Sequence, residues 1–269
     1  MEVIECADRP RAVVMLAHGL NQRASALRPL AEALRSRGAS VVLVAFRGHR
    51  IGDEVDAVSL EDWRQVTWDH WREDWREGAI TGGALAASLG VPLYFVGFSL
   101  GALVHVHELV AGEPLSRSFD AQVLLAPAIR VHARSRLVRI FRFLGPRFLV
   151  PSLAPVPVRS HRGTSVAAYE ALFRYEAALA GVERPERLHL PTLVLMDARD
   201  ELVSVDGLRA WIAIHDLGAH WRLESVEKDR ATAGYGPRHY ITDEVGMGPQ
   251  PFHDLVERVA AALDLGQRA

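Results

Sequence analysis

The chain alternates short apolar runs with longer stretches of helical periodicity. The apolar runs lie at residues 12–17, 41–46, 92–98, 122–127, 192–197 and, more weakly, 221–226. The first five runs are continuously apolar rather than alternating, which indicates strands buried on both faces, as in a parallel sheet covered by helices. The pattern therefore predicts an α/β fold with a mostly parallel central sheet and helices on both of its faces.

Two of the intervening stretches have the spacing of crossover helices. Residues 26–38 place leucines and an alanine on one helical face and stop at a glycine. Residues 60–89 predict a long helix, broken near Gly82-Gly83. It carries four tryptophans among charged residues: Trp63, Trp68, Trp71 and Trp75. Because aromatic side chains dominate protein cores, we interpret these tryptophans as the stripe that packs the helix on the sheet, not as a stacking platform for a ligand.

The regular alternation fails in the middle of the sequence. The spacing between the runs at 122–127 and 192–197 is far longer than the two to six residues usual for a connection of this kind. That stretch contains two helical pieces and a proline-rich segment between them. We therefore predict one core, formed by residues 1–128 and 189–269, with a helical cap inserted at 129–188.

Composition narrows the functional classes. A net charge of −2 over 269 residues offers no general attraction to nucleic acid, which we do not expect as a partner. Cys6 is the single cysteine, so no intramolecular disulfide forms. The acidic start of the chain lacks the features of a secretory signal, and no apolar stretch reaches the roughly 18 residues of a membrane span. These features predict a cytoplasmic protein.

A nucleophile motif follows the third apolar run. The letters GFSLG at 97–101 have the form G-x-S-x-G and stand between a predicted strand and a predicted helix. In that context the motif indicates a tight, strained turn that lifts a serine above the sheet, with glycines where a side chain would collide. Ser99 is therefore the candidate nucleophile, and a simple tight turn is the alternative.

A serine hydroxyl needs a base to take its proton and a carboxylate to orient that base. In the strand, turn and helix architecture of the G-x-S-x-G enzymes, the acid follows a later strand and the histidine comes after the last one. His239, shortly before the final helical segment, has the expected position. Asp197 and Asp200 both lie at the end of the run at 192–197, and both stay candidates. Six other histidines have no catalytic context: His105, His107, His189, His215, His220 and His253.

The mechanism also requires two backbone N–H groups for the oxyanion. One belongs to the residue after the nucleophile, Leu100, and the other to a loop after an early strand. The loop after the first run reads HGLNQ at 18–22, where Gly19 allows close backbone approach and Leu20 presents its amide. By itself this dipeptide is compatible with an ordinary turn.

Together these motifs resemble α/β-hydrolases of the carboxylesterase and monoacylglycerol-lipase-like group, and the resemblance spans nearly the whole chain. HGL at 18–20 resembles the oxyanion motif of that group, and FRGHR at 46–50 its R-G-H-G segment, with Arg50 in place of a glycine. DARDELVS resembles its G-x-x-D-x-x-V acid motif and RHYITDE its H-x-x-T-x-D motif. The resemblance implies an α/β-hydrolase fold and favours Asp200 over Asp197 as the acid.

The expected function is hydrolysis of a small carboxylic ester with an apolar acyl group, such as a monoacylglycerol or a lysolipid, through an acyl-enzyme. We expect no cofactor and no metal, because the sequence lacks G-x-G-x-x-G, H-E-x-x-H and any Cys/His cluster. The same triad serves a thioesterase, an amidase or an acyltransferase. A non-catalytic receptor with a hydrolase pocket is the alternative outside the enzymes.

The predicted cap is strongly basic. Residues 121–169 contain no Asp or Glu but eight arginines: Arg130, Arg134, Arg136, Arg139, Arg142, Arg147, Arg159 and Arg162. As an α-helix, residues 134–145 would gather one apolar face of Leu137, Ile140, Phe141 and Leu144, with arginines towards the other. We expect the apolar face to line an acyl pocket and the arginines to contact anionic lipid peripherally. A solvated surface paired with acidic residues elsewhere is an equally weighted alternative.

Overall fold

The computed structural model describes residues 1–52, 57–229, 231, 234 and 236–265. A seven-stranded sheet crosses its centre in the order β1-β3-β2-β4-β5-β8-β9, and all neighbouring strands are parallel except β1 and β3. The strands are β1 (Glu2–Ile4), β2 (Ala12–Ala17), β3 (Ala39–Val44), β4 (Leu93–Phe98), β5 (Ala121–Leu125), β8 (Thr192–Met196) and β9 (Trp221–Ser225). All six predicted strands are present. The prediction omitted β1, a three-residue edge strand in which one residue is buried.

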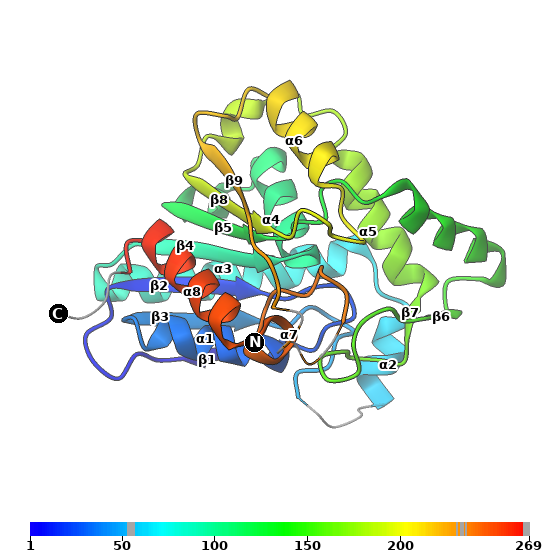
Figure 1. The fold of residues 1–269 in the computed structure, drawn as a ribbon, viewed down its shortest axis with the longest axis horizontal. Coiled ribbons are helices and arrows are strands. Elements are labelled where there is room, and N and C mark those ends of the chain that lie inside the picture. Colours follow the sequence, from blue (N-terminus) through cyan, green and yellow to red (C-terminus); the bar gives the residue numbers. More distant parts are fainter. Residues whose placement is uncertain (53–56, 230, 232–233, 235, 266–269) are drawn as a thin grey trace.

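Helices cover both faces of this sheet, as predicted. α1 (Arg28–Arg35) and α8 (Pro249–Ala262) contact each other on one face, while α3 (Trp68–Leu89) and α4 (Leu100–Ala111) contact each other on the opposite face (Figure 1). The remaining helices are α2 (Ala57–Trp63), α5 (Val166–Ala178), α6 (Val205–Ile214) and α7 (Glu244–Met247). Every residue of β2 and β3 is buried, which explains their unbroken apolar runs.

The break in the predicted 60–89 helix lies elsewhere than expected. α2 ends at Trp63 and α3 begins at Trp68, whereas Gly82 and Gly83 lie inside a continuous helix. Thr67 accepts a hydrogen bond from the backbone N–H of His70 and caps α3, so the capping residue decides the boundary. Gly82 does not break the helix, and it lies close to β4, since a side chain there would approach Leu93 to 3.1 Å.

Two of the four tryptophans pack as predicted. Trp71 and Trp75 of α3 are fully buried in the core, whereas Trp63, also fully buried, lies at the end of α2 and packs against His49 and His161. Trp68 is half-buried and packs at the edge of the core.

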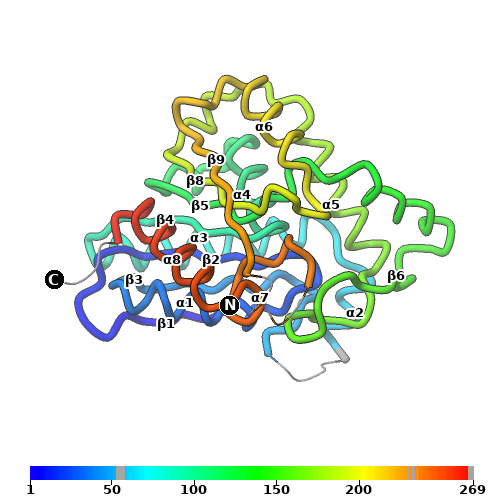
Figure 2. Tube along the Cα trace, viewed as in Figure 1, coloured from blue at the N-terminus to red at the C-terminus, as the bar shows by residue number. Residues whose placement is uncertain are grey.

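Between β5 and β8, where every residue is described, the chain adds no strand to the central sheet. We call residues 129–188 the insertion. It contains the 3₁₀ helix η3 (Ala133–Leu144), the hairpin of β6 (Leu149–Pro151) and β7 (Gly163–Ser165), helix α5 and the short η4 (Pro185–Leu188). Figure 2 traces it as the green segment beyond the carboxyl ends of the strands. The remaining 3₁₀ helices are η1 (Ala24–Leu27) and η2 (Pro114–Ser118). No helix in the described part of the chain is long and apolar enough to span a bilayer.

Candidate active site

Ser99 lies in the turn between β4 and α4, at the carboxyl end of a central strand. Its backbone has φ 50° and ψ −104°, a strained conformation that a non-glycine residue seldom adopts. A side chain at Gly97 would come within 2.8 Å of the backbone N of Ala102, and one at Gly101 within 2.5 Å of the Ala17 carbonyl. The two glycines of the motif are therefore required by contact, as the sequence predicted.

Three predicted residues lie in one hydrogen-bonded line at this edge of the sheet. Ser99 Oγ is 2.9 Å from His239 Nε2, and His239 Nδ1 is 2.7 Å from Asp200 Oδ2. All three side chains are buried. With Nδ1–H donating to the carboxylate, Nε2 is the free acceptor for the serine hydroxyl proton, which is the arrangement of a general base.

The two candidate acids have different surroundings. Asp200 Oδ1 accepts backbone N–H groups from Leu202 and Val203 at 2.7 and 2.8 Å. Burial opposes ionisation of this carboxyl, but His239 and the two N–H donors outweigh it and hold its pKa below the ordinary value. Asp197 instead accepts from Arg199 N–H, and burial raises its pKa. Asp200 is thus the ionised group that contacts the histidine.

The predicted oxyanion donors also lie here. Leu100 is the first residue of α4, and Leu20 lies in the loop after β2 and lines the cavity above Ser99. Among the described residues no acceptor is bonded to either backbone N–H. Two free amides, one of them at a helix N-terminus, are suited to a developing negative charge.

Side chains that the sequence reasoning did not assign hold the oxyanion loop in place. His18 Nε2 accepts the Phe46 N–H at 3.1 Å, and His49 Nε2 accepts the Asn21 N–H at 3.0 Å. Gln22 accepts the Gly19 N–H and donates to Thr242, three residues after His239. His18 and His49 lie inside the motifs HGL and FRGHR, so the sequence marked both histidines. Their role in supporting the oxyanion loop is visible only from the contacts in the structure.

Burial keeps both of these histidines neutral. It lowers the pKa of His18 to about 4 and that of His49 well below the ordinary value, and in His49 the neighbouring His18 adds to the effect. A neutral ring is necessary, because only an unprotonated Nε2 accepts the backbone N–H of Phe46 in the case of His18 and of Asn21 in the case of His49.

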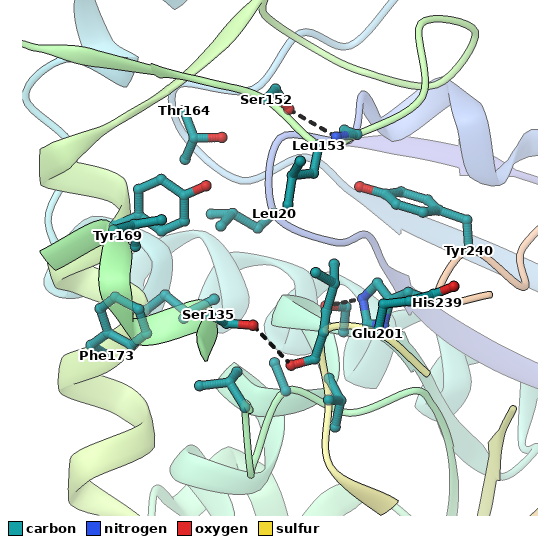
Figure 3. Close-up of a pocket in the computed structure, with 18 of the residues that line it drawn as sticks. Leu20, Ser135, Ser152, Leu153, Thr164, Tyr169, Phe173, Glu201, His239 and Tyr240 are labelled. Atoms are coloured by element: carbon teal, nitrogen blue, oxygen red, sulfur yellow. Dashed lines mark hydrogen bonds between the residues drawn. The ribbon is translucent and has the colours of Figure 1, made fainter. Parts of the chain in front are cut away.

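A cavity of about 460 Å³ opens above Ser99. Figure 3 shows Tyr169 and Phe173 of α5 on one side and His239 and Tyr240 on the other. Leu20, Leu153 and Leu172 also line it, so its wall is mostly apolar, and its volume is in the range of roughly 300–1,000 Å³ typical of ligand sites.

The predicted role of the apolar face of residues 134–145 is wrong. The segment is a 3₁₀ helix, whose period of three places Leu137, Ile140 and Phe143 in one row. These side chains are 72%, 69% and 78% exposed, and η3 instead contributes Arg134, Ser135 and Val138 to the cavity. The apolar wall comes from several segments, of which α5 contributes Tyr169, Leu172 and Phe173.

Three of the insertion's arginines pair with carboxylates outside 121–169, as the alternative reading of the basic segment requires. Arg136 contacts Glu176 at 2.7 Å, Arg142 contacts Glu170 at 2.7 Å, and Arg147 contacts Glu61 at 2.6 Å.

Comparison with known proteins identifies a family for the chain. The profile of the family described as serine aminopeptidase, S33, matches residues 8–214. No curated protein matches the chain.

Solved structures share the fold at low identity. A soluble variant of monoglyceride lipase from Saccharomyces cerevisiae, in complex with a substrate analogue, has a TM-score of 0.78 at 14% identity over 99% of this chain and 91% of that chain. Monoacylglycerol lipase from Paleococcus ferrophilus gives 0.66 at 17% identity, covering 97% and 98%. A thermostable carboxyl esterase from Bacillus coagulans, in complex with glycerol, gives 0.62 at 12% identity, covering 97% and 93%.

The predicted α/β-hydrolase fold is therefore confirmed. The family profile covers more than half of the chain, from before β2 to the end of α6. The chain thus belongs to the serine aminopeptidase S33 family of α/β-hydrolases, which confirms the predicted hydrolase of the carboxylesterase and monoacylglycerol-lipase-like group.

Proposed function

We propose that the protein cleaves carboxylic esters with apolar acyl groups, using Ser99 as nucleophile, His239 as base and Asp200 as the orienting acid. The observation that carries this proposal is the line of two hydrogen bonds, 2.9 and 2.7 Å long, from Ser99 through His239 to Asp200. It lies at the floor of a mostly apolar cavity.

In the first half of the reaction Ser99 Oγ attacks the ester carbonyl carbon while its proton passes to His239 Nε2. The carbonyl oxygen becomes an oxyanion that the N–H groups of Leu20 and Leu100 stabilise. The C–O bond to the alcohol then breaks, and the departing oxygen takes the proton from His239. The acyl group is left on Ser99.

In the second half a water molecule attacks the acyl carbon and gives its proton to His239 Nε2. The bond to Ser99 Oγ breaks, the serine recovers the proton, and the carboxylic acid leaves. Asp200 stays ionised throughout and stabilises the imidazolium, in keeping with its lowered pKa.

The cavity favours an acyl chain over a polar or charged group. Leu20, Phe98 and Leu172 supply apolar surface close to Ser99, and burial of each methylene of a substrate contributes about 0.8 kcal/mol. The similar folds of a monoglyceride lipase and a carboxyl esterase support the same substrate class. We therefore infer monoacylglycerol-like or lysolipid-like esters as substrates.

The row of Leu137, Ile140 and Phe143 supports peripheral contact with lipid. These exposed apolar side chains stand on a helix that also carries Arg136, Arg139 and Arg142, and such a combination suits the interface of an anionic membrane.

A fluorophosphonate reagent and a chain-length series test the proposal. The protein should be labelled at Ser99, and kcat/KM should rise with acyl length in a series of soluble p-nitrophenyl esters and then of monoacylglycerols. A folded protein that never reacts would point to a non-catalytic receptor. Faster turnover of matched thioesters or amides would indicate a thioesterase or an amidase. A strict preference for the shortest chains would contradict the lipid-like substrate.

A further inference from the structure

A second cavity, outside the site of Ser99, lies between the insertion and the connection from α2 to α3. Its volume is about 780 Å³. Five arginines line it: Arg64, Arg139, Arg142, Arg147 and Arg174. We call this cavity the arginine groove. Phe173 is its one lining residue, among those described, that also lines the catalytic cavity.

The groove has more positive than negative charge. Arg142 pairs with Glu170, which also lines the groove, and Arg147 pairs with Glu61. Within the described residues no carboxylate forms an ion pair with Arg64, Arg139 or Arg174. Three guanidinium groups around one cavity thus form no ion pair with a carboxylate of the described residues, and Arg64 interacts with the already paired Glu61 only at longer range.

Two of these guanidinium groups are held against aromatic rings. The guanidinium carbon of Arg174 lies 3.9 Å from the centre of the Trp68 ring, and that of Arg139 lies 5.7 Å from the centre of the Phe173 ring. Stacking of this kind holds the cation in place while leaving its N–H edge free to donate.

Two buried donors of residues that line the groove also have no acceptor. Arg64 Nε and the Trp68 indole Nε1 are buried and have no hydrogen-bond partner, although both are donors. Thr67 and Trp68 at the N-terminus of the 22-residue helix α3 complete the wall, and that end of a helix favours an anion. Asp69 lies in the first turn of α3, and Glu61 is already paired with Arg147.

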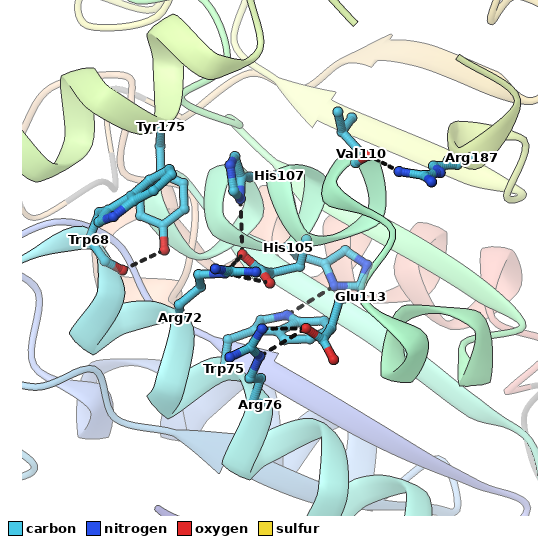
Figure 4. Close-up of polar contacts among 11 residues, drawn as sticks. Trp68, Arg72, Trp75, Arg76, His105, His107, Val110, Glu113, Tyr175 and Arg187 are labelled. Atoms are coloured by element: carbon cyan, nitrogen blue, oxygen red, sulfur yellow. Dashed lines mark hydrogen bonds and ion pairs between the residues drawn. The ribbon is translucent and has the colours of Figure 1, made fainter. Parts of the chain in front are cut away.

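Two arginines of the neighbouring helix α3 show that this excess of positive charge is local to the groove. Figure 4 shows Arg72 and Arg76, further along the same helix, each directed at a carboxylate. Arg72 contacts Glu108 at 3.0 Å and Arg76 contacts Glu113 at 2.5 Å. Both α3 arginines thus have a carboxylate partner, whereas Arg64, Arg139 and Arg174 at the groove form no ion pair among the described residues.

We propose that the arginine groove is a binding site for a phosphate monoester. A phosphate monoester carries a charge of about −1.5 to −2 and three acceptor oxygens, which match three unpaired guanidinium groups better than a single carboxylate does. The phosphate belongs either to a lipid headgroup or to a soluble ester. This site is independent of the proposed ester hydrolysis, since it shares only Phe173 with the catalytic cavity.

Titration calorimetry with inorganic pyrophosphate and glycerol 1-phosphate at low salt tests the site. The double variant Arg64→Gln/Arg174→Gln should weaken binding at least about tenfold, because it removes two charge-assisted contacts to the phosphate. Arg209→Gln on α6 is the matched control. It removes an exposed arginine that pairs with Asp206 outside both cavities, and it should bind like the wild type.

Vesicles of phosphatidylcholine with and without phosphatidate separate the two sources. Binding only to phosphatidate vesicles, displaced by pyrophosphate and lost in the double variant, would establish a lipid headgroup. Binding of the soluble compounds with no vesicle preference would establish a soluble ester.

Absence of binding to both, or equal binding by the double variant, would overturn the proposal. Hydrolysis of p-nitrophenyl acetate and the melting temperature should be unchanged in the double variant. Loss of phosphate binding at the groove and loss of ester hydrolysis are therefore measured by separate assays.

Discussion

The catalytic edge of the sheet and the exposed helix η3 of the insertion differ in burial and in hydrogen bonding. At the edge, Ser99, His239 and Asp200 are buried and each is bonded to another. In η3, by contrast, no residue is buried, and its apolar row faces solvent.

The difference shows how much each region depends on its sequence being exact. A buried turn such as that at Gly97 and Gly101 leaves no space for a side chain, so few sequences satisfy it and the motif is informative. An exposed helix has few contacts that specify it, so its pattern fits several orientations.

Removal of the nucleophile should cause the largest loss of activity. Ser99→Ala should lower kcat for p-nitrophenyl butyrate on the order of 10⁶-fold, as loss of a triad serine does, because no other group can form the acyl-enzyme. The melting temperature should stay the same, since alanine is no more strained than serine at φ 50°. Stopped-flow and steady-state assays measure the first quantity and calorimetry the second. Activity near that of the wild type would refute the mechanism.

Removal of charge from the acid should have the next largest effect. Asp200→Asn should lower kcat about 10⁴-fold, because an amide leaves His239 in the wrong tautomer. Asp197→Asn is the matched control and should cost less than about tenfold, since its carboxylate lies near Arg199 and Arg238 and forms no bond with the histidine. The reverse ranking of the two variants would reassign the acid to Asp197.

The sequence predicted the sheet better than the insertion for a physical reason. Strands such as β2 and β5 are buried on both faces, so their residues must be apolar throughout and their runs end at their boundaries. The α2–α3 break was misplaced because Gly82 serves close packing against Leu93 and does not end a helix. The true boundary is set by the capping hydrogen bond of Thr67, which forms only in the folded conformation.

The candidate site was predictable where a motif coincides with a strand end. Ser99 and His239 follow from such positions, and Asp200 required a family resemblance because Asp197 satisfies the same topology. The support of the oxyanion loop by Gln22 and Thr242 was not predictable, because these residues are 220 positions apart and nothing local marks their contact.

Titration of the buried His18 tests how strongly burial at the catalytic edge controls protonation. His18 in the folded protein should take up a proton near pH 4, whereas an unfolded chain does so near pH 6.5. Between these two pH values the unfolded chain binds a proton at His18 that the folded protein does not bind, so a falling pH favours unfolding. The contribution of His18 to stability is complete above pH 6.5, falls as the pH drops and is lost near pH 4, a difference of about 3 kcal/mol.

Nuclear magnetic resonance of the imidazole nitrogens measures this pKa directly. Burial raises the pKa of Asp74 to about 6, so protonation of Asp74 stabilises the folded protein as the pH falls and opposes the effect of His18. Stability should therefore be compared in the wild type and in Asp74→Asn. The variant should lose stability more steeply between pH 6.5 and 4. A His18 resonance that titrates near pH 6.5 would contradict the prediction.

Substitution in the exposed row of η3 should have the smallest effect on the fold. Ile140→Ser and Phe143→Ser should change the free energy of unfolding by less than about 0.5 kcal/mol, since side chains 69% and 78% exposed bury little surface that the unfolded chain exposes. Leu103→Ala in the buried helix α4 is the contrasting variant and should cost about 2–5 kcal/mol. Urea denaturation measures all three. A loss above 1 kcal/mol in the η3 variants would mean that the row packs against protein in solution, and the proposed contact with lipid would then lose its apolar surface.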